Sequence, residues 1–554
     1  MSPTAISDNF QQVDFQDLKS KVVEGHVELE ETPKPSVADD FMYDFKYNHS
    51  LPTTDALGVS IPEDADPQAA AEELLAKLSQ ALGKGDAQAF TGSFLDYGVW
   101  RDKLAFSWDY RTFNWAENIS QAAADLLPTN RCGKFEILKP ALQKPYPDLG
   151  FLQFILAFDT PLTRASGLLI AEGWKIWTLH TVAASLLQFP EVDPSDGHMT
   201  GSVSWENQRA ADDDQIKPDV LVAGGGQNGL AIAARLKALG VSNLIIERNA
   251  EIGEIWRKRY EYLADHLPYF PFPKQWPTYT SAQKLGIFMQ WYASALELPV
   301  WTKSTITKAE QDVDGKWTVE INKDGETRVL HPKHVVSNGL YCSLNSSYMS
   351  SGHGYFTVRC SNDARRSWYG QVEGNVRHST ANDSSRDWVG KKVLVVGTSS
   401  SGFHTAYDCA GVDIVVTILQ RSPTYVMSLT HSVPRGIGNY EPKKGLPLPD
   451  FEEQDRLFHS TPLGPGEPLA RRNCATLEKL DKELLDGLHA KGLKTYAGQR
   501  GTGQVTLGST RNGGFYFEAG ACEQIIKGKI KVEQGFVESF TGACDCFWRC
   551  GTGP

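Results

Sequence analysis

The sequence lacks the features that mark membrane proteins and nucleic-acid-binding proteins. No stretch of about 18 or more apolar residues is present, so we expect no membrane-spanning helix. The N-terminus is polar and lacks the apolar segment of a secretory signal, which predicts a cytoplasmic protein. The net charge is −12 and no long basic run occurs, which argues against nucleic acid as a partner.

Paired cysteines are also absent. The nine cysteines are scattered and include no Cys-x-x-Cys pair. The densest group, Cys544, Cys546 and Cys550, has no nearby histidine and matches no common zinc spacing. We therefore expect reduced thiols and no metal site.

Composition divides the chain into several regions. At 554 residues it is too long for one hydrophobic core. Residues 1–66 mix acidic residues, proline and serine with isolated aromatics, which predicts a mostly flexible N-terminal arm. Residues 191–216 are polar and rich in Asp, Ser and Gly, which predicts a linker.

Residues 67–190 predict a small α+β domain. Leucine and alanine recur at helical spacing, and an aromatic-rich stretch and strand-like runs follow. The run Phe94–Phe113 resembles the NTF2-like (SnoaL-like) cone fold. That resemblance implies a role in packing, in shaping a substrate site or in forming a homodimer. Asp102, Asp109 and Arg111 could line a pocket, but a structural ion pair near a turn is the favoured interpretation.

The stretch after residue 217 has the pattern of a βαβ unit that binds a dinucleotide. The apolar strand Val220–Ala223 leads into a turn with G-x-G-x-x-G spacing. Gly224 permits the tight turn, Gly226 lets the backbone approach a pyrophosphate, and Gly229 lets the helix pack on the strand. Glu247 ends the second strand, where a carboxylate can accept hydrogen bonds from ribose hydroxyls. The site therefore suits FAD or NAD rather than NADP.

A second βαβ pattern occupies residues 391–422. Its turn contains Gly397, Ser399 and Gly402, so a serine stands at the middle fingerprint position, where it still permits the turn but crowds a pyrophosphate. Arg421 follows the second strand in place of an acidic residue. A cation there suits a 2′-phosphate, which predicts NADPH; the alternative is an exposed surface arginine.

Further residues resemble the flavin-containing monooxygenase family. The segment GEIWR at 253–257 and the segment HLPYFPFPKQW from His266 carry the likeness, which extends through most of 217–540. The resemblance implies FAD at the first turn, with Trp256 and Arg257 close to the flavin. It also implies NADPH at the second turn and an Arg at the position of Arg421.

The implied fold is α/β, with two Rossmann-type domains that follow the α+β cone domain. FAD is assigned to residues 217–340 with 510–554, and NADPH to 341–509. The resemblance implies an NADPH- and FAD-dependent monooxygenase. Such an enzyme inserts one oxygen atom from O2 into a small organic substrate, at nitrogen, sulfur or a carbonyl, through a C4a-hydroperoxyflavin. Alternatives are another FAD/NAD(P)H oxidoreductase, such as an NAD(P)H oxidase, and a catalytically impaired relative.

The sequence departs from the family in four places. The segment after Tyr260 is short, the usual loop after the meander reads Ser337-Asn338-Gly339, and the F-x-G-x3-H pattern survives only in part, ending at His378. His378 is a candidate link between the nucleotide domains or a plain structural histidine. The chain is also expected to stop before the family's closing strand. Such losses fit a truncated or mis-spliced reading frame or a decayed enzyme.

Overall fold

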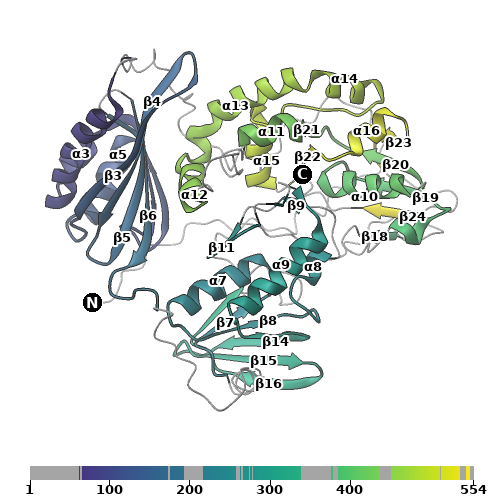
Figure 1. Cartoon of the computed structure of the whole chain (residues 1–554), viewed down its shortest axis with the longest axis horizontal. Coiled ribbons are helices and arrows are strands. Elements are labelled where there is room, and N and C mark those ends of the chain that lie inside the picture. Colours follow the sequence, from purple (N-terminus) through teal and green to yellow (C-terminus); the bar gives the residue numbers. More distant parts are fainter. Residues whose placement is uncertain are drawn as a thin grey trace, which may run out of the picture. The chain divides into compact units, whose positions relative to one another are not determined.

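Figure 1 shows the computed structural model of the chain. The structure describes residues 62, 65–172, 175–192, 216–257, 262–263, 266–273, 275–276, 279–337, 376–378, 385–412, 414–436, 451–511, 513–536 and 545–548. The predicted arm and linker therefore lie almost wholly outside the described residues, as does Cys550.

The N-terminal domain is a six-stranded sheet backed by helices. Helices α3 (Pro67–Lys84), α4 (Ala87–Gly92) and α5 (Ala116–Leu126) share one hydrophobic core with the sheet, and α3 and α5 lie against one face of it in Figure 1. The strand order is β2-β1-β6-β5-β4-β3. The strands are β1 (Phe94–Lys103), β2 (Tyr110–Asn114), β3 (Gly133–Tyr146), β4 (Leu149–Asp159), β5 (Thr163–Glu172) and β6 (Lys175–Leu186). The predicted α+β character is thus observed, whereas the likeness to NTF2-like proteins stays a prediction.

Aromatic rings fill the interior of this domain. The fully buried Trp100 meets Phe90, Phe106 and Phe113 edge-on or tilted, at centroid separations of 5.0, 5.3 and 5.3 Å. Its indole N–H donates to Thr181 Oγ1 at 3.1 Å. The aromatic-rich stretch therefore supplies the core of the domain, where each ring gains burial and edge-to-face contact.

The first dinucleotide unit is a parallel four-stranded sheet in the order β13-β8-β7-β17. Its elements are β7 (Val220–Ala223), α7 (Gln227–Ala238), β8 (Asn243–Ile246), β13 (Val300–Trp301) and β17 (His334–Ser337). All residues of β7 and β8 are buried, as expected for a parallel sheet covered on both faces. One cover is an antiparallel meander, formed by β14 (Ser304–Gln311), β15 (Trp317–Lys323) and β16 (Glu326–Leu330).

Short elements and one long helix complete this unit. Helix α8 (Glu254–Arg257) packs on α9 (Ala282–Ala295), which buries Phe288, Met289 and Tyr292 in the same core. Two small pairs of strands lie between them in sequence: β9 (Tyr262–Leu263) with β12 (Tyr279–Thr280), and β10 (His266–Leu267) with β11 (Phe270–Pro271).

The second dinucleotide unit is a parallel five-stranded sheet in the order β18-β24-β19-β20-β23. Its strands are β18 (Val376–His378), β19 (Lys392–Val396), β20 (Val415–Gln420), β23 (Ile530–Gln534) and β24 (Asp545–Trp548). Helix α10 (Ser400–Gly411) connects β19 to β20, and α16 (Ala521–Ile526) precedes β23. Both helices bury residues in one core with the sheet.

Within residues 510–554, the described strands β23 and β24 join the second sheet rather than the first, which corrects the predicted assignment of this segment to the FAD-binding domain. β23 pairs with β20, and β24 lies between β18 and β19. Ile525 of α16 and Ile530 of β23 are buried in the core around α10. The expectation that the chain stops before the family's closing strand stays a prediction; in this sheet β24 occupies a central position.

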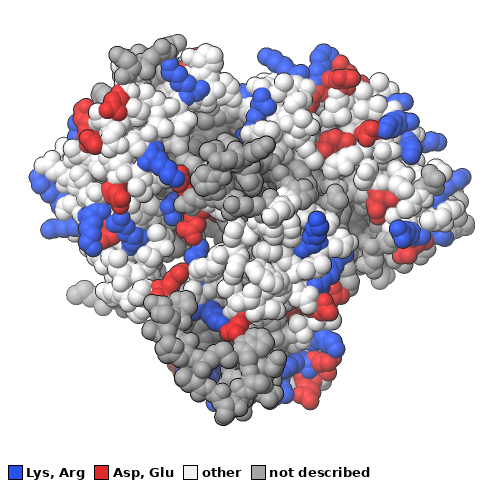
Figure 2. Space-filling model, in the orientation of Figure 1, with Lys and Arg blue, Asp and Glu red and all other residues white. Residues whose placement is uncertain are grey.

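Helices and one strand pair complete the second unit. β21 (Tyr425–Ser428) pairs in parallel with β22 (Phe515–Glu518). The helices are α11 (Leu429–Gly436), α12 (Phe451–Ser460), α13 (Leu463–Leu480), α14 (Lys482–Ala490) and α15 (Gln504–Arg511), with short 3₁₀ turns η5 (Ser385–Trp388) and η6 (Gln499–Gly501). Among the described residues, none of the helices combines the length and apolarity needed to cross a membrane. Figure 2 shows acidic and basic side chains interspersed over the described part of the face in view.

Candidate functional site

The first glycine turn has the backbone geometry that a phosphate-binding turn needs. Gly224 directly follows β7 and has φ +101°, a left-handed conformation that side chains disfavour. Gly226 caps α7 in an extended conformation, and a Cβ atom added there would meet no atom within 4 Å. Open space therefore faces the N-terminus of α7, where backbone N–H groups and the helix dipole favour an anion.

Gly225, the residue between them, has a packing role. A Cβ atom on Gly225 would lie 2.4 Å from Ile252 Cδ1 and 3.1 Å from Glu247 Oε2. A 2.4 Å approach would force the Ile252 side chain to move, and 3.1 Å is tighter than most real contacts, so a side chain here would disturb the packing around the turn. The two neighbouring glycines thus have separable roles. Gly225 packs against protein atoms, whereas Gly226 borders the open space at the N-terminus of α7.

Glu247 lies directly after β8 and is nearly buried, with 8% exposure. Its Oε2 accepts the Gly225 N–H at 2.8 Å, and its Oε1 accepts from the backbone N–H and the side-chain amide of Asn249 at 2.8 and 2.7 Å. A carboxylate offers about four acceptor positions, so these three bonds leave about one for a ribose hydroxyl. The carboxylate thus holds the glycine turn through the Gly225 N–H and keeps about one acceptor position for a further hydrogen bond.

The remaining predicted residues of the first unit support the turn from within the protein. Gly229 is buried in α7, and Trp256 is 6% exposed within the same hydrophobic core. Arg257 forms an ion pair with Glu251 at 3.0 Å and a hydrogen bond with Gln290 Oε1 at 2.5 Å. The structure therefore brings Gly224, Gly226 and Glu247 together, while Trp256 and Arg257 contact protein groups.

A close crossing of two backbones fixes this arrangement. Gly253 has φ +82°, and a Cβ atom there would lie 2.2 Å from the Gly286 carbonyl oxygen. A Cβ atom on Gly286 would in turn lie 2.7 Å from Arg257 Cγ. Sequence patterns did not single out Gly286, because a lone glycine inside a helical pattern gives no sign of its partner.

The second glycine turn repeats the geometry of the first. Gly397 directly follows β19 with φ +111°, and a Cβ atom added there would meet no atom within 4 Å. A Cβ atom on Gly402 would lie 2.0 Å from the Gly397 carbonyl oxygen, so glycine permits α10 to approach the strand. Ser399 caps α10, and its Oγ accepts the Gly514 N–H at 3.0 Å. The serine hydroxyl is thus engaged with the start of β22.

The end of β20 presents a different chemistry from the end of β8. Gln420 is fully buried, and its amide group bonds both backbone groups of Lys494, with distances of 2.7 Å from the Lys494 N–H and 2.9 Å to its carbonyl oxygen. Arg421 follows as an exposed residue and forms no ion pair with another described residue. Gln420 therefore holds Lys494, also exposed, next to the strand end that carries Arg421. Sequence patterns missed Lys494, because it lies 73 positions after Arg421 in the chain.

The other sequence candidates have different positions. His378 ends β18 and pairs in register with Trp548 of β24, which pairs with Val396 of β19, so the His378 backbone lies two strands from the second glycine turn, at the same end of the sheet. Asp109 and Arg111 form an exposed ion pair at 2.8 Å, as the favoured interpretation predicted. Asp102 is buried and accepts hydrogen bonds from Thr181 Oγ1 at 2.6 Å and from Ser107 Oγ at 2.8 Å; burial raises its pKa. It holds the turn after β1, a structural role.

Two units of strand, glycine turn, helix and strand define a protein with two Rossmann-type dinucleotide-binding domains, as predicted. No protein-family model matches the chain. It is 28% identical over 217 residues to the probable indole-3-pyruvate monooxygenase YUCCA9 of Arabidopsis thaliana, a match that covers 37% of this chain and 48% of the relative. A 25% identical match to the probable indole-3-pyruvate monooxygenase YUCCA8 of the same plant covers 331 residues, 58% of this chain and 69% of the relative.

The homologues of the chain are thus YUCCA flavin monooxygenases, which confirms the resemblance to flavin-containing monooxygenases. The chain spans about half the length of most of the curated relatives that it matches. Solved structures with detectable similarity include an oxidized steroid monooxygenase bound to NADP, 15% identical with a TM-score of 0.39, covering 61% of this chain and 71% of that chain. A flavin-containing monooxygenase from Stenotrophomonas maltophilia is 18% identical with a TM-score of 0.30, covering 38% and 60%.

Proposed function

We propose that the chain is an NADPH- and FAD-dependent monooxygenase that inserts one oxygen atom from O2 into a small organic substrate. One observation carries the proposal: two similar glycine turns are followed by opposite chemistry at the end of the next strand. The first strand end presents the carboxylate of Glu247, and the second presents the cation of Arg421. Two dinucleotides of different type fit this pair of sites better than one dinucleotide bound twice.

FAD fits the first unit. The open side of Gly226 leaves room for a pyrophosphate at the N-terminus of α7, and Glu247 has an acceptor position left for a ribose hydroxyl. A 2′-phosphate would place negative charge beside this carboxylate. When bound, flavin supplies the redox chemistry with O2, while these residues bind and orient it.

NADPH fits the second unit. Gly397 leaves the turn open, and Arg421 and Lys494 offer two cations at the adjoining strand end. A guanidinium can bond a phosphate through two parallel N–H groups, and a lysine adds a point charge. The Gln420 amide, bonded to both backbone groups of Lys494, keeps that residue in place.

The proposal is tested with the purified full chain. We expect flavin absorbance, oxidation of NADPH in the presence of O2, and transfer of ¹⁸O from labelled O2 to a substrate. A colourless protein that binds no added FAD would refute it. Peroxide formed in equal amount to NADPH consumed, with no oxygenated product from any nitrogen, sulfur or carbonyl compound, would indicate an NAD(P)H oxidase instead.

Arg421→Ala tests the assignment of the two nucleotides. Loss of a charge-assisted contact to phosphate costs about 1.5–3 kcal/mol, so the KM for NADPH should rise about 10- to 100-fold. The KM for NADH, which has no 2′-phosphate, should change little. Lys529→Ala is a matched control, because this exposed lysine precedes β23 at the opposite end of the sheet. An equal effect of Arg421→Ala on both coenzymes would contradict the assignment.

We also propose a cytoplasmic location and a homodimer. The described cysteines Cys132, Cys409, Cys474 and Cys522 are free buried thiols, which are typical of a reducing compartment. Subcellular fractionation tests the first proposal and light scattering after size exclusion tests the second.

A further inference from the structure

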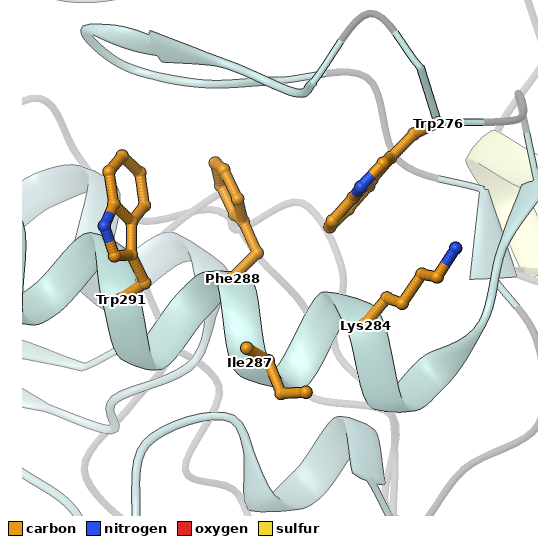
Figure 3. A pocket seen from close by; sticks show the side chains of 5 residues that line it. All are labelled: Trp276, Lys284, Ile287, Phe288 and Trp291. Carbon is orange, nitrogen blue, oxygen red and sulfur yellow. The ribbon is translucent and has the colours of Figure 1, made fainter.

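Helix α9 carries an aromatic pocket that neither dinucleotide site uses. Lys284, Ile287, Phe288 and Trp291 line it from positions i, i+3, i+4 and i+7, which share one face of a helix, and Trp276 lines it from the preceding segment. Figure 3 shows Phe288 between the two tryptophans and the Lys284 ammonium at the Trp276 end. None of the predicted nucleotide-binding residues lines this pocket.

The pocket walls are held in place by rings behind them. Trp276 stacks on Phe272 with centroids 5.5 Å apart, and Trp291 meets Phe270 edge-on at 5.1 Å. Phe288, which is buried at the back of the pocket, contacts Trp276 at 5.7 Å and Trp291 at 5.5 Å. A ligand would therefore meet a preformed surface, and binding would cost little ordering of side chains.

The front of the pocket exposes apolar surface to water. Ile287 is 61% exposed and Trp291 is 48% exposed, although both project from a helix whose other face is well buried. The cavity volume is about 260 Å³. That is just below the usual range of small-molecule pockets, about 300–1,000 Å³, and the hollow is open to solvent, which suits a molecule of one or two rings.

Charge decides which aromatic molecule fits. Among the described residues that line the pocket, Lys284 is the only charged one, and it forms no ion pair within the described part of the chain. Indole faces attract cations, but the ammonium of Lys284 at the rim repels them. An anion on a flat ring system satisfies both the aromatic walls and the lysine.

We propose that this pocket binds a planar aromatic carboxylate of one or two rings, with the ring against Phe288 and Trp291 and the carboxylate at Lys284. The site is independent of the proposed monooxygenase activity. The ligand would occupy it whether or not FAD and NADPH bind.

Calorimetry on the full chain tests the proposal with 2-naphthoate and its uncharged analogue 2-naphthamide. We expect saturable 2-naphthoate binding with a Kd below about 1 mM, several-fold tighter than 2-naphthamide. Lys284→Met should weaken 2-naphthoate about threefold to fivefold and leave 2-naphthamide unchanged. Ile287→Glu, at an exposed position, should weaken 2-naphthoate by a similar factor through repulsion. Lys316→Met, an exposed lysine before β15, is the matched control.

Trp291→Ala should weaken both ligands at least tenfold, with helical content and melting temperature retained because the side chain is half exposed. Equal binding of the charged and uncharged ligands, or unchanged binding in Lys284→Met and Trp291→Ala, would overturn the proposal. A third result would also overturn it: the chain fails to bind 2-naphthoate but self-associates, and Trp291→Ala abolishes that self-association. The face would then be an interface between two copies.

Discussion

Two glycine substitutions separate the nucleotide-binding role of the glycine turns from their role in folding. In Gly226→Ala the new Cβ atom meets no protein atom within 4 Å, and the residue has φ −74°, which alanine adopts freely. Alanine at this position restricts the unfolded chain, which stabilises by about 0.4–1 kcal/mol, and is a slightly poorer helix cap, which offsets that gain. We expect the free energy of unfolding to change by less than about 1 kcal/mol.

The same methyl group occupies the space through which a pyrophosphate reaches the N-terminus of α7. Displacing the phosphate would weaken charge-assisted bonds to backbone N–H groups, each of about 1.5–3 kcal/mol. A total loss on the order of 3 kcal/mol corresponds to about 100-fold weaker FAD binding. Titration of FAD into protein stripped of flavin measures the Kd, and urea denaturation of the stripped protein measures stability.

Gly402→Ala is the converse case. Its Cβ atom would lie 2.0 Å from the Gly397 carbonyl oxygen, a backbone atom, so α10 must shift away from the sheet. Such overpacking costs about 1–3 kcal/mol. We expect lower stability with FAD binding at the other unit retained. Normal flavin affinity in Gly226→Ala, or parental stability in Gly402→Ala, would refute the reasoning.

Three further substitutions test individual contacts. In Glu247→Gln, the new amide N–H₂ group would face a backbone N–H donor, either that of Gly225 or that of Asn249. The free energy of unfolding should therefore fall by about 1–3 kcal/mol, and FAD affinity should fall with it. Urea denaturation and FAD titration measure the two effects. Ser399→Gly restores the common fingerprint but removes the bond to Gly514, so stability should fall by about 1 kcal/mol without loss of NADPH affinity, which denaturation and coenzyme titration would check. Burial, with Lys103 and Arg101 nearby, lowers the pKa of His180 to about 3; the unfolded chain therefore binds the extra proton first, and stability should be lost as the pH falls from about 6.5 toward 3. The free energy of unfolding should fall by up to about 1.4 kcal/mol per pH unit in this range, and by less in His180→Gln. If denaturation at several pH values gave both proteins the same slope, His180 would not be the group responsible.

Local patterns predicted the two glycine turns, because each depends on residues within one βαβ unit. Gly224, Gly226 and Glu247 meet within the described unit as expected, and so do Gly397, Ser399 and Gly402. The spacing of the glycines reflects the backbone conformation of the turn and the close approach of the helix to the strand. Both depend on residues that are near one another in the sequence.

Long-range pairing was the part that the sequence could not predict. The segment 510–554 was assigned to the first unit, because a short apolar strand carries no information about which parallel sheet it joins. The same limit hid the partners of Gln420 and Gly286, whose contacts lie with Lys494 and Gly253. Residues identified from a family pattern, such as Trp256 and Arg257, were found to contact protein groups.

The two strand ends show why the identity of one residue does not determine coenzyme preference. Glu247 and Gln420 both lie at the end of the second strand of their units, and both are buried or nearly so. Glu247 accepts the Gly225 N–H of its own glycine turn, so its charge stays beside that turn. Gln420 also contacts its own turn, donating to Thr398 Oγ1 at 3.4 Å, and it bonds the backbone of Lys494. The next residue, Arg421, is exposed at the strand end. A Gln420→Glu substitution would therefore put a carboxylate against the Lys494 carbonyl oxygen rather than beside a ribose. The proposed preference for a 2′-phosphate would therefore depend on Gln420 being neutral as well as on Arg421 being a cation.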